Sequence, residues 1–222
     1  MANGAIIVAA GSSQRMGGVD KLLAPLGTRP VIAHSLAAFA SHPRIDVLVV
    51  VASATNEAAI RGLAAGVGTK ANVVLGGPRR RDSVLNGMDA VAGCEYVVVH
   101  DGARPLVTAE MIDATLDGAI ETGAALCAVA VADTVKRADF NGLVQSTISR
   151  DRLWLAQTPQ AFRLDVLRRA HLSHDIDATD DAALVELLGE PVRLVEGSAE
   201  NLKITTPSDL RLAAAILAAR EA

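Results

Sequence analysis

The chain has 222 residues, a length that suits one large domain and leaves little room for a second. Its formal net charge of -4 at pH 7 argues against a nucleic-acid-binding protein, because such proteins carry a basic surface. Half of the residues are hydrophobic but only 2% are aromatic, so the core must consist of Ala, Val, Leu and Ile. That composition is typical of a parallel sheet covered by helices.

The sequence contains no apolar segment of the roughly 18 residues that a membrane-spanning helix requires. Its N-terminus also lacks the charged and long apolar segments of a signal peptide. We therefore expect a cytoplasmic protein that does not bind membranes. The two cysteines, Cys94 and Cys127, lack the spacing of a metal site and should be ordinary reduced side chains.

Apolar, β-branched segments alternate along the chain with segments of helical periodicity. The expected strands are residues 5–10, 47–52, 73–75, 97–100 and 126–132. The expected helices are residues 31–40, 57–65, 83–92, 109–122 and 207–220. This alternation predicts an α/β domain with a mostly parallel sheet, right-handed crossovers and helices on its faces.

Residues 136–155 interrupt this alternation. They lack helical periodicity and carry Asn141-Gly142 between short alternating segments, a pair typical of a tight hairpin. We expect an inserted β-arm there, within a single domain that spans residues 1–222. Because an isolated hairpin is marginally stable, we expect the arm to pack on a second subunit, and an ordinary surface hairpin is the alternative.

Ligands of open parallel sheets bind at the carboxyl ends of the strands, so the residues that follow each strand are the first candidates. Residues 9–18, Ala-Ala-Gly-Ser-Ser-Gln-Arg-Met-Gly-Gly, follow the first strand and precede Lys21. Small residues let backbone N–H groups approach phosphate oxygens, and Arg15 and Lys21 add two cations. The spacing matches neither G-x-G-x-x-G nor a P-loop. It resembles the nucleotidyltransferases that activate sugar phosphates, polyols and the molybdenum cofactor.

Two further junctions carry groups that suit phosphates. Residues 76–84, Gly-Gly-Pro-Arg-Arg-Arg-Asp-Ser-Val, lead into a helix, where Ser83 either caps the helix or bonds a base or phosphate. Residues 100–105, His-Asp-Gly-Ala-Arg-Pro, follow the fourth strand. Asp101 can hold Mg²⁺ through water or accept a ligand hydroxyl, and Arg104 can bind a phosphate bidentately. Each motif alone is also compatible with an ordinary turn or cap.

Four later segments complete a pattern: residues 132–137 (Ala-Asp-Thr-Val-Lys-Arg), 157–162 (Gln-Thr-Pro-Gln-Ala-Phe), 179–182 (Thr-Asp-Asp-Ala) and 201–207 (Asn-Leu-Lys-Ile-Thr-Thr-Pro). With the three loops above, and in this order, they resemble the methylerythritol phosphate cytidylyltransferases of the non-mevalonate isoprenoid pathway. The resemblance implies a Rossmann-like fold of the nucleotide-diphospho-sugar transferase type. It also implies transfer of CMP from CTP to 2-C-methyl-D-erythritol 4-phosphate with release of pyrophosphate. Mg²⁺ would be the cofactor, held mainly by the nucleotide phosphates, and the enzyme would be a homodimer.

The resemblance assigns roles to individual residues. Arg15 and Lys21 would neutralise charge on the triphosphate as pyrophosphate leaves, and Arg150 and Lys203 would position the acceptor phosphate, so these four are the expected catalytic residues. The implied nucleotide-binding residues are Ala9, Ala10, Gly11, Arg15, Lys21, Gly77, Ser83, Asp101 and Gly102. The implied acceptor-binding residues are Asp101, Arg104, Thr134, Arg150, Thr158 and Lys203. Arg150 would reach across the dimer, so that two chains build each site.

Two features depart from the family pattern. Pro78 stands where better-known members often carry an acidic residue, and the stretch between Arg15 and Lys21 is short. Neither departure removes a residue that the chemistry needs.

Three alternatives remain. The same chemistry on another polyol phosphate, such as ribitol 5-phosphate, would use the same fold and several of the motifs. A nucleotide-binding regulator without catalysis is disfavoured by the joint presence of Arg15, Lys21 and Lys203. A metal hydrolase is disfavoured because the histidines are scattered, and the lone pair His171 and His174 is expected to mark a solvated helix end.

Overall fold

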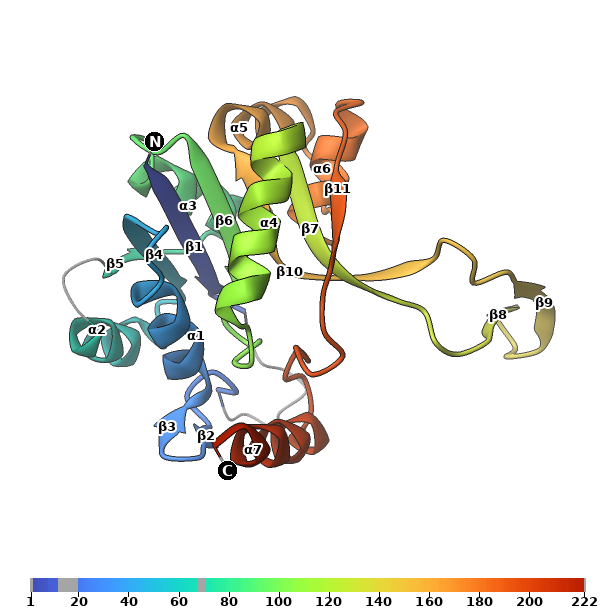
Figure 1. The fold of residues 1–222 in the computed structure, drawn as a ribbon, viewed down its shortest axis with the longest axis horizontal. Coiled ribbons are helices and arrows are strands. Elements are labelled where there is room, and N and C mark those ends of the chain that lie inside the picture. Colours follow the sequence, from blue (N-terminus) through green and yellow to red (C-terminus); the bar gives the residue numbers. More distant parts are fainter. Residues whose placement is uncertain (1, 12–19, 68–70, 222) are drawn as a thin grey trace.

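The computed structural model describes residues 2–11, 20–67 and 71–221. Its centre is a seven-stranded sheet in the order β11-β7-β10-β6-β1-β4-β5 (Figure 1). The strands are β1 (Asn3–Ala9), β4 (Val47–Ala52), β5 (Ala71–Leu75), β6 (Tyr96–Asp101), β7 (Ala124–Ala130), β10 (Trp154–Arg163) and β11 (Arg193–Glu196). The pairs β1–β4, β1–β6, β4–β5 and β11–β7 are parallel, whereas β10 runs antiparallel to β6 and β7. The expected mostly parallel sheet is confirmed.

Helices cover both faces of the sheet (Figure 1). One face carries α1 (Val31–Ala40), α2 (Glu57–Gly66) and α4 (Ala109–Thr122), and the other carries α3 (Arg80–Ala90), α5 (Leu164–Ser173) and α6 (Asp181–Leu187). Successive strand residues point to opposite faces, so Ile7 packs in the same cluster as Phe39 and Ile6 packs with Met88. The strands are therefore apolar on both faces because both faces are buried.

The segment between residues 154 and 200 holds elements that the sequence pattern did not predict: β10, α5, α6 and β11. The helix expected at residue 83 begins at Arg80. His171, which was expected at a solvated helix end, is fully buried in α5, and its Nε2 lies 3.0 Å from Oδ1 of Asp181. That expectation was wrong because the partner carboxylate lies on a helix that the sequence pattern missed.

The last helix, α7 (Pro207–Glu221), closes a small apolar cluster beside the short strands β2 (Pro25–Leu26) and β3 (Arg29–Pro30). Leu26, Leu106 and Ile204 are buried in this cluster, and the Ile204 N–H donates to the Ala103 carbonyl over 2.8 Å. This contact fixes residues 201–204 against the end of β6. It places Lys203 beside the carboxyl ends of the strands.

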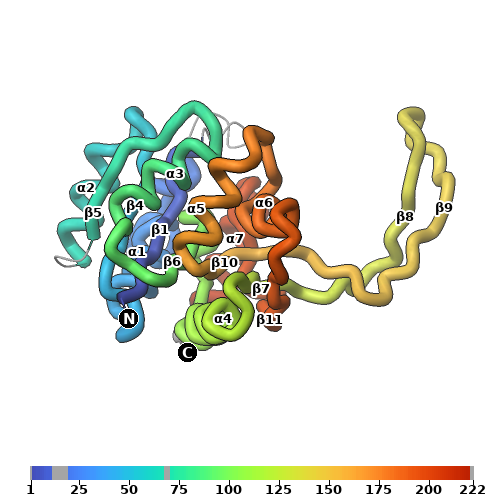
Figure 2. Tube along the Cα trace, turned by 90° about the horizontal axis from the view of Figure 1, so that it is seen from above, coloured from blue at the N-terminus to red at the C-terminus, as the bar shows by residue number. Residues whose placement is uncertain are grey.

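The expected β-arm forms and projects away from the sheet (Figure 2). It consists of β8 (Val135–Ala138) paired antiparallel with β9 (Val144–Ile148). Its loop is Phe140-Asn141-Gly142, in which Gly142 adopts a φ of 82° and Asp139 Oδ1 accepts the N–H groups of Asn141 and Leu143. The Asn-Gly pair thus belongs to a three-residue loop and not to a two-residue turn.

Cys94 and Cys127 are buried free cysteines, as expected. Within the described residues, no helix combines the length and the apolarity needed to cross a bilayer.

Candidate active site

A cavity of about 340 Å³ lies at the carboxyl ends of β1 and β6, beside the loop that precedes α3. We call it the larger cavity. Of the residues expected to bind a nucleotide, its wall contains Ala9, Ala10, Gly11, Lys21, Gly77, Ser83 and Asp101. Arg15 lies outside the described residues. The structure therefore brings together residues from three loops that are far apart in the sequence.

A second cavity of about 180 Å³, which we call the smaller cavity, adjoins the first. Of the residues expected to bind the acceptor, its wall contains Asp101, Arg104, Thr158 and Lys203. Arg80, Asp101 and Lys203 belong to the walls of both cavities. A ligand in one cavity would therefore lie against a ligand in the other.

Cations outnumber carboxylates among the described wall residues of the larger cavity, although the chain as a whole is acidic. These wall residues include four cations, Lys21, Arg79, Arg80 and Lys203, and one carboxylate, Asp101. A triphosphate is a suitable ligand for a wall with this excess of cations, because fixed cations stabilise its negative charge in a site that is partly shielded from water.

The loop before α3 is tight, which accounts for its glycines. A Cβ on Gly77 would lie 2.4 Å from Cβ of Asp82. The Gly77 N–H donates to Ser83 Oγ over 3.2 Å, and Ser83 Oγ also lies 3.2 Å from the Arg79 carbonyl oxygen. Arg79, and not Ser83, is the N-cap residue of α3. Ser83 therefore fixes the shape of this loop while its side chain borders the larger cavity.

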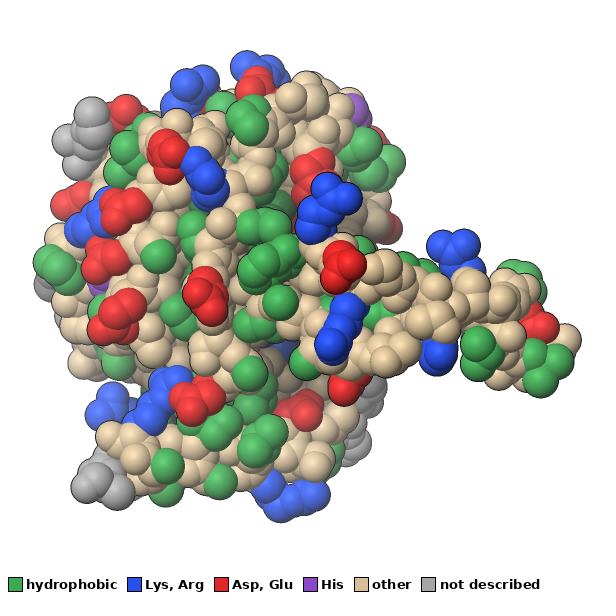
Figure 3. Space-filling view, turned by 45° about the vertical axis from the view of Figure 1, so that its right-hand side comes forward, with side chains coloured by type: hydrophobic (Ala, Val, Ile, Leu, Met, Phe, Trp, Pro, Cys, Tyr) green, Lys and Arg blue, Asp and Glu red, His purple; other side chains and the backbone are tan. Residues whose placement is uncertain are grey.

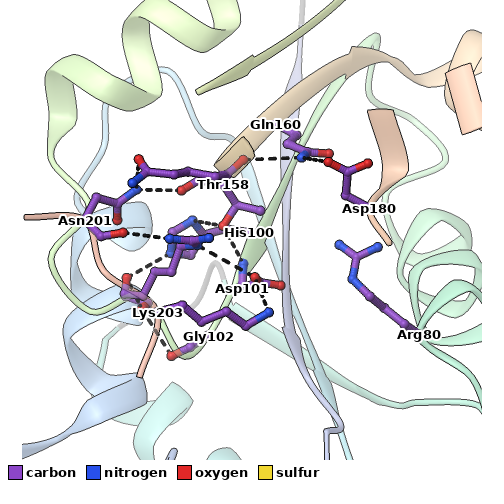
Figure 4. A network of polar contacts seen from close by, with 12 residues as sticks. Arg80, His100, Asp101, Gly102, Thr158, Gln160, Asp180, Asn201 and Lys203 are labelled. Carbon is purple, nitrogen blue, oxygen red and sulfur yellow. Dashed lines mark hydrogen bonds and ion pairs between the residues drawn. The ribbon is translucent and has the colours of Figure 1, made fainter. Parts of the chain in front are cut away.

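Asp101 and Lys203 form an ion pair in the wall that the two cavities share. Nζ of Lys203 lies 2.8 Å from Oδ2 of Asp101 (Figure 4). Burial alone would raise the pKa of the Asp101 carboxyl, but the charges of Lys203, Arg80 and Arg104 outweigh burial and lower it to about 2. Asp101 is therefore ionised at neutral pH.

His100 is fully buried and bonds two residues of the smaller cavity's wall, Arg104 and Thr158. Its Nε2 lies 3.1 Å from the Arg104 carbonyl oxygen, so Nε2 carries the proton and donates. Its Nδ1 lies 3.2 Å from Thr158 Oγ1 and must accept from that hydroxyl. Thr158 Oγ1 in turn accepts the Asp101 N–H over 3.0 Å. Burial lowers the pKa of His100 to about 4, which keeps the imidazole neutral as this chain of hydrogen bonds requires.

A second set of hydrogen bonds joins the segments around Thr158 and Lys203 (Figure 4). Arg104 Nη1 donates to the Asn201 carbonyl over 2.7 Å, and Asn201 Nδ2 donates to the Thr158 carbonyl over 2.9 Å. Burial lowers the pKa of the Arg104 guanidinium, although Asp101 opposes this shift. These contacts hold strand β10 and the chain before α7 in one position relative to β6.

The smaller cavity also contains polar residues that were not among the expected site residues: Arg80, Gln157, Gln160, Thr179 and Asp180. Gln160 Nε2 donates to Asp180 Oδ2 over 2.9 Å, and Asp180 Oδ1 accepts the Ala183 N–H at the start of α6. Arg80 lies in the motif at residues 76–84, and the signal for the other four was present in the motifs at residues 157–162 and 179–182. Their placement depends on β10 and α6, which the sequence pattern did not predict.

Three expected residues do not reach either cavity within one chain. Gly102 lies beside them, where its N–H donates to the Val8 carbonyl and a Cβ would lie 3.2 Å from Cγ2 of Ile7. Thr134 and Arg150 are exposed at the start and the end of the arm, and the Arg150 guanidinium donates to the Ala132 carbonyl. The roles of Thr134 and Arg150 remain predictions.

Comparison with known proteins gives a consistent result. The family model described as 2-C-methyl-D-erythritol 4-phosphate cytidylyltransferase matches residues 4–219. Curated proteins of that name from Dehalococcoides mccartyi and Pelotomaculum thermopropionicum are 44% and 45% identical, over 96% and 98% of this chain and 95% and 94% of theirs. The crystal structure of 4-diphosphocytidyl-2C-methyl-D-erythritol synthase from Anaerococcus prevotii is similar with a TM-score of 0.86 and 30% identity, covering 98% of both chains. This chain therefore belongs to the 2-C-methyl-D-erythritol 4-phosphate cytidylyltransferase family.

Proposed function

We propose that this protein transfers CMP from CTP to 2-C-methyl-D-erythritol 4-phosphate, forming 4-diphosphocytidyl-2-C-methyl-D-erythritol and pyrophosphate. The observation that carries the proposal is the pair of adjoining cavities with Arg80, Asp101 and Lys203 in their common wall. Two ligands bound there would meet at charged side chains. Such an arrangement suits the joining of two phosphorylated molecules.

The larger cavity is assigned to CTP and the smaller one to the acceptor. The smaller cavity offers Arg80, Arg104 and Lys203 to a phosphate, and carboxylate, amide and hydroxyl groups to a polyol. This mixture fits a molecule that carries one phosphate and several hydroxyl groups. Asp101 and Asp180 are the carboxylates of this wall that can accept hydrogen bonds from ligand hydroxyls.

The reaction needs electrostatic stabilisation more than proton transfer. An oxygen of the acceptor phosphate forms a bond to the α-phosphorus of CTP, while the bond from the α-phosphorus to the α,β-bridging oxygen breaks. Pyrophosphate leaves with that electron pair. Two like charges at 4 Å repel by about 4 kcal/mol at an effective dielectric constant of 20. Cations must therefore neutralise charge as the acceptor phosphate approaches the phosphates of CTP. We assign this task to Arg15 and Lys21, with Arg150 and Lys203 positioning the acceptor phosphate.

We further propose that Mg²⁺ is the cofactor and enters with the nucleotide, held mainly by the CTP phosphates. Within the described residues, no group of three or more His, Cys, Asp or Glu side chains converges to hold a metal ion. Asp101 is the acidic residue among the described wall residues of the larger cavity, and its carboxylate is ionised. It would contact the metal through water, and the metal would neutralise phosphate charge when bound.

The functional unit in this proposal is a homodimer of single-domain chains, each spanning residues 1–222. The arm supports it, because Phe140, Leu143 and Val144 near its end are exposed, Phe140 completely so (Figure 3). Apolar side chains gathered on a projecting hairpin indicate a partner surface. Residues Thr134 and Arg150 of one chain would complete the acceptor site of the other. No nucleic acid or membrane takes part, and we propose a cytoplasmic location.

Pyrophosphate release by the purified protein tests the proposal. With Mg²⁺ and CTP, we expect release with 2-C-methyl-D-erythritol 4-phosphate and little or none with ribitol 5-phosphate. Release with ribitol 5-phosphate alone would retain the chemistry and replace the acceptor. Absence of release with both compounds, together with binding of CTP, would replace the enzyme by a nucleotide-binding regulator.

A further inference from the structure

Arg80 lies where the two cavities meet. It belongs to the motif at residues 76–84, but none of the roles assigned from the sequence included it. It is the first residue of α3, and its side chain, which is 28% exposed, borders both cavities. Figure 4 shows the side chain extending from α3 toward Asp180. Arg80 and Lys203 are the two cations among the described residues that lie in both walls.

The buried carboxylate of Asp181 holds the Arg80 guanidinium in place. Nη2 of Arg80 donates to Oδ2 of Asp181 over 2.7 Å, and the Asp181 side chain is fully buried. Burial by itself would lower the pKa of Arg80, but the charge of Asp181 more than compensates and raises it. The Arg80 guanidinium is therefore charged and oriented before any ligand binds.

His171 holds Asp181 in turn. Its Nε2 lies 3.0 Å from Oδ1 of Asp181, and its side chain is fully buried. One carboxylate oxygen thus bonds the imidazole and the other bonds the guanidinium. A buried ion pair is costly to desolvate and contributes little to stability on that account. Its position next to a ligand cavity indicates a functional reason for the pair.

The neighbouring arginines are engaged differently. Arg79 bonds Asp82 and Asp175, and Arg81 bonds Asp175 and the His171 carbonyl. Among the described residues, Asp181 is the one hydrogen-bond partner of the Arg80 side chain. A guanidinium has five N–H donors, so Arg80 retains donors for phosphate oxygens in either cavity.

We propose that Arg80 is a further catalytic residue, which contacts the phosphate groups where nucleotide and acceptor meet, and that Asp181, held by His171, is its positioning residue. This inference rests on the proposed function. It adds a second fixed cation, the planar guanidinium of Arg80, opposite Lys203 in the proposed site. The pair would lie on either side of the oxygen and phosphorus atoms that form the new bond.

The test is a double-mutant cycle on the full-length enzyme. The variants are Arg80→Gln, Asp181→Asn and the two together. Arg80→Lys is added to separate the effect of the positive charge from that of the paired N–H donors of the guanidinium. Arg81→Gln is the control, since it removes a neighbouring guanidinium that borders neither cavity. For each variant, kcat, the KM for both substrates, CTP affinity by calorimetry and Tm are measured.

We expect Arg80→Gln to lower kcat/KM by about 10²-fold, as the loss of one electrostatic donor does in other enzymes. Arg80→Lys should recover part of the loss, and Arg81→Gln should change Tm more than kcat. If Asp181 acts through Arg80, the double variant should be no slower than Arg80→Gln. Asp181→Asn alone leaves the charge of Arg80 unpaired and could for that reason fail to fold. In that case the double variant, which removes both charges, is still compared with Arg80→Gln.

Two results would overturn the inference. Arg80→Gln with kcat/KM close to that of the wild type would remove Arg80 from the reaction. Losses that multiply in the double variant would show that Asp181 acts independently of Arg80. A wild-type enzyme that binds CTP without turnover would instead contradict the proposed function. The CTP affinity of Arg80→Gln would then show separately whether Arg80 contacts the nucleotide.

Discussion

Nζ of Lys203 lies 2.8 Å from Oδ2 of Asp101, across about a hundred residues of sequence. Asp101 ends β6, and Lys203 arrives on the segment that the Ile204 N–H fixes to the Ala103 carbonyl. The pair lies in the wall common to both cavities. It therefore links the nucleotide side of the proposed site to the acceptor side.

Lys203→Met should raise the pKa of the Asp101 carboxyl. Burial already acts to raise this pKa, and Lys203 is the first of the cations that oppose it. Titration of the carboxyl carbon by NMR measures the effect in the wild type and the variant. The variant should also lose acceptor binding, seen as a KM for the acceptor that rises while the KM for CTP changes less. An unchanged carboxyl titration would contradict the assigned ion pair.

His100→Phe tests the neutral imidazole through the pH dependence of stability. Burial lowers the pKa of His100 to about 4, below its usual value in an unfolded chain of about 6.5. Between these values the unfolded chain binds more protons, so the wild type should lose stability as the pH falls from about 6.5 to about 4.

The variant fills the space beside Phe39, whose ring centroid lies 5.0 Å from that of His100, but it cannot titrate. Its Tm should be lower at neutral pH, because Thr158 Oγ1 and the Arg104 carbonyl each lose a partner. Its Tm should then fall less between pH 6.5 and 4 than that of the wild type. Parallel Tm curves for the two proteins would show that His100 does not carry this dependence.

Lys21→Ala and Arg15→Ala should each lower kcat by about 10²-fold without unfolding the protein. Lys21 borders the larger cavity, and Arg15 is assigned from the sequence motif. Arg168→Ala is the matched control, since Arg168 pairs with Asp89 away from both cavities. Steady-state pyrophosphate release and circular dichroism provide the measurements. Near-normal turnover in both loop variants would refute the electrostatic mechanism.

The shared-site proposal predicts rescue between two inactive variants. Arg150→Ala removes the residue assigned to the neighbouring chain's site, and Lys203→Ala removes a residue of the chain's own site. A mixed dimer contains one site with both residues intact, so mixing should restore part of the activity. Sedimentation of Phe140→Asp supplies the structural control, because a charge at the exposed end of the arm should weaken the dimer. Verified mixed dimers without activity would indicate that each site belongs to one chain.

The parallel part of the fold was predictable because its strands carry a clear apolar pattern. Since parallel strands end at the same edge of the sheet, the loops around Gly11, Gly77 and Asp101 could be placed together before the structure was known. The structure confirms that these loops line one cavity. The arm was predictable for a similar reason, namely the Asn-Gly signal within a segment without helical periodicity.

Strand β10 was not predictable from its sequence. Gln157, Thr158, Pro159 and Gln160 lie within it and read as a loop, because polar residues and proline disfavour a central strand. The pairing with β7 shifts register between Ala156 and Gln160, which accommodates the proline. The buried polar groups find partners on distant segments, among them Asp180 and Asn201. Local sequence patterns carry no information on such partners, so the Arg80–Asp181 contact was missed as well.

The most direct test of the central claim follows the oxygen atoms of the acceptor phosphate. The enzyme is given CTP, Mg²⁺ and 2-C-methyl-D-erythritol 4-phosphate whose phosphate carries ¹⁸O, and the products are analysed by mass spectrometry and ³¹P NMR. Attack by the acceptor phosphate on the α-phosphorus predicts that all label stays in 4-diphosphocytidyl-2-C-methyl-D-erythritol and none enters pyrophosphate. Label in the released pyrophosphate, or no cytidylylated product in a preparation that binds CTP, would contradict the proposed reaction.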